Sequence, residues 1–117
     1  MPWIVAAGIS GALAIVAGAF GAHGLKEQVS PELLAAWRTG ASYHLLHSVV
    51  LLALGTLAVS TQKSVTLPAA LFCTGILLFS GSLYGLALTH WSWLGPLTPL
   101  GGLTLIAAWL SLCSLAR

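Results

Sequence analysis

The sequence predicts an all-α integral membrane protein whose four helices cross the bilayer as one four-helix bundle. Two observations lead to this fold class. Hydrophobic residues make up 58% of the 117 residues and charged residues only 5%, whereas globular domains average about 45–50% and 25%. All acidic and basic side chains also lie outside four long apolar runs. A water-soluble bundle would instead carry polar stripes at a period of about 3.6 residues.

Chain length restricts this architecture to a single domain, residues 1–117. A helix that crosses an apolar core of about 30 Å needs about 20 residues, so four of them use about 80 residues. What remains is enough for short loops only. The apolar runs place the four helices at about residues 3–22, 41–60, 67–89 and 98–115.

The first apolar run is interpreted as a retained helix and not as a signal peptide. The residues before it contain no Lys or Arg, and the run is longer than the usual signal-peptide core of about 7–15 residues. Small residues recur along it at intervals of four, and the third run has a similar pair. Because small residues let helices approach closely in lipid, we expect helix contacts at Gly11, Gly18, Gly21, Gly81 and Gly85.

Residues 23–40 form the most polar segment of the chain. Ser30, Pro31 and Glu32 have the pattern of a helix start: a serine cap, a proline at the first position and an acid near the positive end of the helix dipole. Leu33, Leu34 and Trp37 then fall on one face. This pattern predicts a short amphipathic helix at about residues 31–39 that lies in the membrane interface. Gly40 is interpreted as a bend before the second span.

The histidines are predicted to gather at one membrane face. With four spans, the loops after the first and third helices share a face, and His23 and His90 follow those helices. His44 and His47 fall in the first two turns of the predicted second helix, which begins at the same face. His47 is predicted to be the deepest ionisable side chain. An ionisable group inside a span is a functional candidate by default.

Two interpretations of these histidines remain open. His44 and His47 are three residues apart and share one side of a helix. Together with His23 they could bind a transition metal, a haem or a quinone, or relay protons. The plainer interpretation is that each histidine only bonds to a neighbouring helix. No paired carboxylates, nucleophile elbow or phosphate loop is present, so no catalytic residue is predicted and the metal and cofactor remain unidentified. The candidate polar cluster consists of His23, Tyr43, His44, His47 and Tyr84.

Charge and cysteine usage restrict the partners. The net charge of +2 is too small to indicate nucleic-acid binding. Cys73 and Cys113 lie in apolar runs without a CxxC spacing and are interpreted as small apolar residues. The expected partners are therefore the lipid bilayer and either another membrane protein or a second copy of the chain.

Four segments resemble a known family. Residues 18–25, Gly-Ala-Phe-Gly-Ala-His-Gly-Leu, resemble the signature of the membrane proteins called domain of unknown function 423, whose animal relatives are called transmembrane protein 256. Residues 37–40 with Tyr43 and His47, residues 78–84 and residues 95–102 are also similar. The resemblance implies a multi-pass protein of the bacterial inner membrane with no established activity. It also implies that a shared site would lie among His23, Tyr43, His47 and Tyr84, and His44 stands where the family pattern favours glutamine.

The leading hypothesis is a non-enzymatic accessory or assembly partner of a membrane complex, or a homo-oligomer. It rests on the glycine-rich helices, the missing catalytic constellation and the small extramembrane mass. The alternative is a histidine-based metal, haem or quinone site at one membrane face. A permeation path is disfavoured because the inner half of the spans has almost no polar residues.

Overall fold

The computed structural model describes residues 2–116 and shows a chain of helices. The α-helices are α1 (Pro2–His23), α2 (Pro31–Thr61), α3 (Thr66–Thr89) and α4 (Leu97–Ser111), and 3-10 turns η1 (Ser92–Leu94) and η2 (Leu112–Ala116) flank α4. Four helical segments are long and apolar enough to cross a membrane. The predicted all-α, four-span fold class is therefore confirmed. The last residue of the sequence, Arg117, lies outside the described residues.

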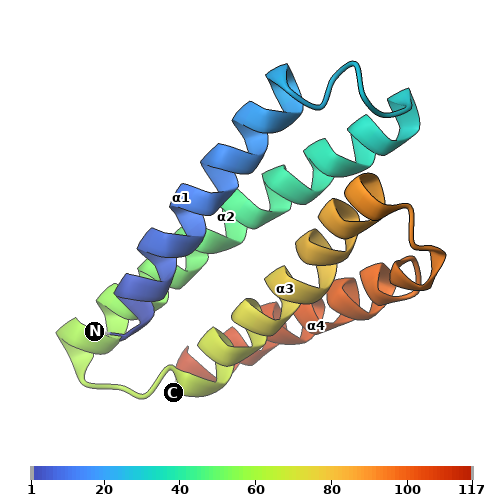
Figure 1. Cartoon of the computed structure of the whole chain (residues 1–117). Coiled ribbons are helices and arrows are strands. Elements are labelled where there is room, and N and C mark those ends of the chain that lie inside the picture. Colours follow the sequence, from blue (N-terminus) through green and yellow to red (C-terminus); the bar gives the residue numbers. More distant parts are fainter. Residues whose placement is uncertain (1, 117) are drawn as a thin grey trace.

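The helices form a flattened arrangement (Figure 1). α1 packs on α2, α2 on α3, and α3 on α4, and the Cα atoms extend over 47 × 26 × 16 Å. Both ends of the chain lie at one end of the molecule, and the α1–α2 and α3–α4 loops lie at the other (Figure 1). α1 is therefore an edge helix, with α2 as its main neighbour.

The predicted interfacial helix at residues 31–39 is wrong, because these residues are the first turns of α2. The predicted start is present: Pro31 is the first residue, and the Ser30 side chain accepts a hydrogen bond of 3.2 Å from the Leu33 backbone N–H. The helix then runs without interruption to Thr61. At 1.5 Å per residue it is roughly 46 Å long, which exceeds the apolar core of about 30 Å.

Gly40 forms a helix contact and not a bend. A Cβ atom at this position would lie 3.3 Å from the side chains of Leu83 and Tyr84. The Ser80 hydroxyl of α3 donates a 2.7 Å hydrogen bond to the Gly40 carbonyl. As a consequence, His44 and His47 lie near the middle of α2, roughly 20 and 24 Å from its start, and not in the first turns of a span.

The α3–α4 contact also depends on glycines. A Cβ atom at Gly101 would overlap the backbone of Phe79, and one at Gly75 would lie 2.5 Å from Leu105. Around this contact the buried side chains of Phe72, Leu105 and Ala108 belong to the main apolar core. The close approach gives the helix pair its van der Waals contact area, which is the main source of helix association in lipid.

The glycines predicted as packing positions have different surroundings. A Cβ atom at Gly21 would lie 2.6 Å from the Trp37 ring, and one at Gly85 would lie 2.8 Å from Leu94. One at Gly11 would lie 3.9 Å from Ser48. A Cβ atom at Gly18 or Gly81 would meet nothing within 4 Å, and the same holds for Gly8, which is not one of the predicted positions. Within the described residues, the chain therefore leaves these last three positions uncovered.

Substitution of Gly101 should destabilise the α3–α4 contact, and its neighbour Gly102 is the matched control. We expect Gly101→Ala to lower the free energy of unfolding by about 1–3 kcal/mol, because the new methyl group forces two backbones apart. Gly102→Ala places its methyl group 3.9 Å from Phe79, an ordinary contact, and should change stability by less than about 1 kcal/mol. Denaturant titration in detergent micelles measures both. Equal effects would contradict the packing described.

Candidate functional site

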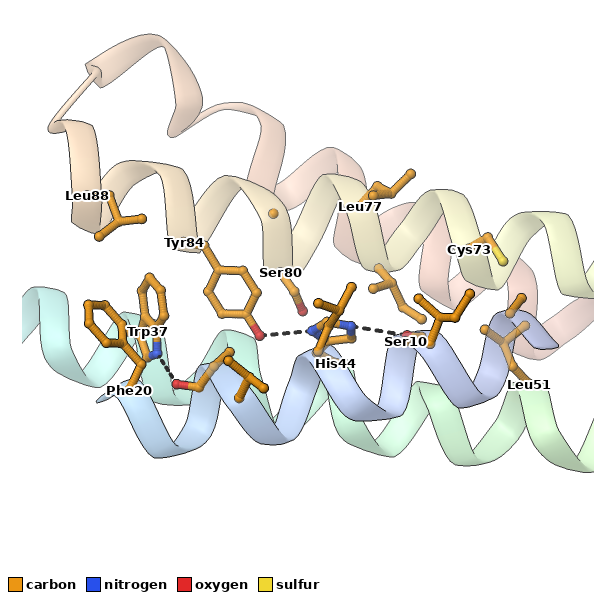
Figure 2. A pocket seen from close by; sticks show the side chains of 17 residues that line it. Ser10, Phe20, Trp37, His44, Leu51, Cys73, Leu77, Ser80, Tyr84 and Leu88 are labelled. Atoms are coloured by element: carbon orange, nitrogen blue, oxygen red, sulfur yellow. Dashed lines mark hydrogen bonds between the residues drawn. The ribbon is translucent and has the colours of Figure 1, made fainter. Parts of the chain in front are cut away.

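A chain of hydrogen bonds around His44 connects α1, α2 and α3. The His44 side chain is 7% exposed. Its Nδ1 lies 3.0 Å from the Tyr84 hydroxyl and its Nε2 lies 3.1 Å from the Ser10 hydroxyl, as Figure 2 shows. The hydroxyl oxygens of Ser10 and Ser48 lie 2.6 Å apart. The Ser48 hydroxyl donates a 2.7 Å hydrogen bond to the backbone carbonyl of His44.

The last bond fixes the direction of the whole chain. Because the Ser48 hydroxyl donates its only hydrogen to the His44 carbonyl, it must accept the hydrogen bond from the Ser10 hydroxyl. Ser10 has then used its proton and accepts from His44 Nε2–H. The Nδ1 atom of this neutral imidazole is left as an acceptor, and the Tyr84 hydroxyl donates to it. His44 is therefore the Nε2–H tautomer.

Trp37 supports this chain at its Tyr84 end. The two rings lie 4.6 Å apart between centroids, and Trp37 Nε1 donates a 2.7 Å hydrogen bond to the Ala17 carbonyl of α1. Because Gly21 has no Cβ atom, the Trp37 indole can pack directly against the backbone of α1. The Tyr84 ring is thus held between α2 and α3 with its hydroxyl directed at His44 (Figure 2).

His47 belongs to a different contact, between α2 and α4. Its side chain is 3% exposed. Trp109 Nε1 donates to His47 Nε2 at 3.1 Å, so His47 Nδ1 carries the proton and donates to the Tyr43 carbonyl at 2.7 Å. The Phe72 ring lies 5.7 Å from the imidazole. Both nitrogens are engaged, and His47 connects the centre of α2 to α4.

The structure divides the predicted cluster. His44 and Tyr84 are hydrogen-bonded to each other. Within this cluster, His47 bonds only to the backbone carbonyl of Tyr43. The Tyr43 ring is 44% exposed and stacks on Phe79. His23 is exposed at the end of α1, roughly 20 Å along that helix from residue 10. Among residues 2–116, no group of three or more His, Cys, Asp or Glu side chains could hold a metal ion.

A groove of about 660 Å³ runs between α1 and α3 above the His44 chain. α2 forms its floor, and the ring of His44 lies in it with the hydroxyls of Ser10 and Tyr84 on either side (Figure 2). The rest of the lining is almost entirely apolar. The groove therefore combines an apolar wall with a few polar atoms on its floor, as small-molecule sites commonly do.

Sequence reasoning misses the partners that orient the histidines: Ser10, Ser48 and Trp109. Ser10 is one of the small residues of the first apolar run, and no sequence motif marks Ser48 or Trp109 as the partner of a histidine. One signal is available, because Ser10 is the only polar side chain between residues 4 and 22. A lone hydroxyl in an apolar span needs a partner within the protein.

The two histidines should show opposite tautomers. Nitrogen-15 NMR of histidine-labelled protein in nanodiscs distinguishes a protonated from an unprotonated ring nitrogen. We expect a proton on Nε2 of His44 and on Nδ1 of His47, because their partners dictate these states. The same tautomer at both residues would contradict the hydrogen bonds described.

Removal of the Trp109 indole N–H should leave its buried acceptor, His47 Nε2, without a hydrogen-bond partner. We expect Trp109→Phe to lower the free energy of unfolding by about 1–3 kcal/mol. Trp93→Phe is the control and should have little effect, since Trp93 lies in η1 and is 61% exposed. The measurement is thermal or denaturant unfolding in detergent, and an equally small effect of both changes would show that His47 does not depend on Trp109.

Comparison with known proteins agrees with this architecture. The family described as "Protein of unknown function (DUF423)" matches residues 17–102. The chain is 44% identical to the UPF0382 membrane protein YwdK of Bacillus subtilis, over 92% of this chain and 89% of that protein. It is 39% identical to a UPF0382 membrane protein of Staphylococcus saprophyticus, over 94% and 92% of the two chains.

A more distant organism has a similar protein. A UPF0382 membrane protein of Schizosaccharomyces pombe is 41% identical, over 92% of this chain and 93% of that one. No solved structure matches the chain. With four apolar helices and relatives named as membrane proteins, the chain is a multi-pass membrane protein. The family match and the relatives together show that it belongs to the DUF423 family of membrane proteins of unknown function.

Proposed function

We propose that this protein is a non-enzymatic assembly component of the membrane that associates with a second copy of itself through α1. The observation that supports this proposal is an outward face of small residues on α1. Gly8, Ala12, Ala19 and Ala22 are all exposed on this helix, with Ile15 as the one large side chain among them. A Cβ atom at Gly8 would meet no other atom within 4 Å.

Such a face favours association in lipid. Apolar side chains gain little by leaving lipid for protein, so helices associate where small residues let their backbones come close. A small-residue face is also self-complementary across a two-fold axis. α1 lies at the edge of the flattened arrangement, packed on α2 (Figure 1), so a second α1 can reach it.

A crevice beside this face provides further contact area. It has a volume of about 340 Å³ and lies between Gly8, Gly11 and Ala12 of α1 and Leu45 and Val49 of α2. A large side chain such as Ile15 of a second copy can enter a crevice of this size. Knobs that enter holes of this kind are the usual way in which paired helices increase their contact.

The histidine geometry supports assembly over metal or haem binding. A metal ligand or general base needs a free ring nitrogen. Both nitrogens of His44 and both of His47 are already in hydrogen bonds. Use of His47 by a metal would leave the Trp109 indole without its acceptor. The same α1 face could instead receive a helix of another membrane protein, which is an outcome of the experiment below.

Gly8→Leu should disrupt self-association, and Gly81→Leu is the matched control. Both positions are exposed and uncovered, but only Gly8 lies on the proposed face. We expect the dimer dissociation constant to rise at least about tenfold in Gly8→Leu, which is a loss of about 1.4 kcal/mol. Gly81→Leu should associate like the wild type. Native mass spectrometry from nanodiscs measures the populations.

Disulfide cross-linking identifies the face directly. In a chain whose Cys73 and Cys113 are replaced by alanine, Ala12→Cys should form a covalent dimer under mild oxidation and Leu13→Cys should not. A wild-type protein that stays monomeric at high protein-to-lipid ratio would contradict the proposal. A complex with a different protein that Gly8→Leu abolishes would keep the α1 face but reject the second copy as its occupant.

A further inference from the structure

We infer that the groove between α1 and α3 binds a lipid-soluble molecule with a long apolar chain and a neutral hydroxyl head, such as a long-chain alcohol or a phenol. The head donates its hydrogen bond to the Tyr84 hydroxyl oxygen. This site is separate from the α1 face described above, because Gly8 and Ala12 do not line the groove.

The shape of the groove fits a hydrocarbon chain. Its lining runs from Ala6 to Phe20 on α1 and from Cys73 to Leu88 on α3, roughly 21 and 22 Å along the two helices. This exceeds the roughly 15 Å depth of one leaflet's apolar layer. The walls are formed mainly by aliphatic side chains such as Leu13 and Leu77. These two side chains are 57% and 73% exposed, so the groove is open from the side.

The polar atoms on the floor select the head group. The Tyr84 hydroxyl donates its hydrogen bond to His44 Nδ1, and the Ser10 hydroxyl donates its hydrogen bond to Ser48. Ser80 is the third hydroxyl in the lining, and it donates to the Gly40 carbonyl. The three hydroxyl oxygens of the groove therefore retain acceptor capacity but have no free hydrogen to donate. A ligand that only accepts, such as an ester or an ether, finds no hydroxyl donor here and only the weak thiol donor of Cys73. An alcohol or phenol supplies its own donor to the hydroxyl oxygens.

The surroundings also exclude a charged head. None of the side chains that line the groove belongs to Asp, Glu, Lys or Arg. Transfer of an ion to such a site is far more costly than transfer of a hydroxyl that gains a hydrogen bond. A phospholipid can place an acyl chain in the groove, but its head group must remain at the interface. Recognition of a hydroxyl therefore distinguishes a specific ligand from bulk lipid.

The test uses the full chain in nanodiscs and two photoreactive probes. One is hexadecanol with a diazirine in its chain, and the other is the methyl ether of the same molecule. We expect the alcohol to label residues of the groove and to bind about two- to tenfold more tightly than the ether, the difference that one hydrogen bond makes. In Tyr84→Phe the alcohol should bind no better than the ether.

Substitutions at uncovered glycines locate the site. Gly81 lines the groove and Gly8 does not. Gly81→Leu should fill the groove and abolish labelling by both probes, whereas Gly8→Leu should leave labelling unchanged even where it disrupts the dimer. Equal binding of alcohol and ether to the wild type would overturn the hydroxyl recognition. Unchanged labelling of Gly81→Leu would overturn the groove as the site, and neither result depends on whether Tyr84→Phe folds.

Discussion

The structure depends on close approach between helices at glycines. Gly101 admits the backbone of Phe79 between α3 and α4, Gly40 admits Leu83 between α2 and α3, and Gly21 admits Trp37 between α1 and α2. In lipid the apolar side chains of a helix are already in an apolar solvent, so burial alone holds nothing together. Short-range contacts must supply the association energy, and these fall off steeply when a gap opens.

The polar chain follows from this approach. Because α3 lies against Gly40, the hydroxyl of Ser80 reaches the Gly40 carbonyl and that of Tyr84 reaches His44. Polar groups in a membrane have to find their partners within the protein. Among the described residues, every buried side-chain nitrogen and oxygen has a hydrogen-bond partner. The histidines at the centre of α2 are thus neutral connectors whose tautomers are set by the neighbouring helices.

The fold class could be predicted from composition, because long uncharged apolar runs have few alternatives to spanning helices. The depth of the histidines could not. Gly40 lies where the sequence changes from polar to apolar. A glycine at such a position can mark a bend in a helix or a close contact with another helix, and the sequence alone does not distinguish the two. The distinction depends on α3, which packs against Gly40 in the structure. The sequence pattern predicts a helix start at about residue 41, which would place His44 and His47 near a membrane face. This start is wrong, because α2 begins at Pro31. Ser10 is easily missed because a serine is both small and polar.

The central claim is that neighbouring helices cover some glycines, such as Gly75 and Gly101, whereas other glycines, such as Gly81, are exposed to lipid. Paramagnetic relaxation by a spin-labelled lipid, read at glycine amides by NMR in nanodiscs, tests this claim most directly. We expect strong broadening at the exposed Gly81 and sharp signals at the buried Gly75 and Gly101. Protection of Gly81 equal to that of Gly75 would show that the groove is closed in the membrane and would contradict the claim.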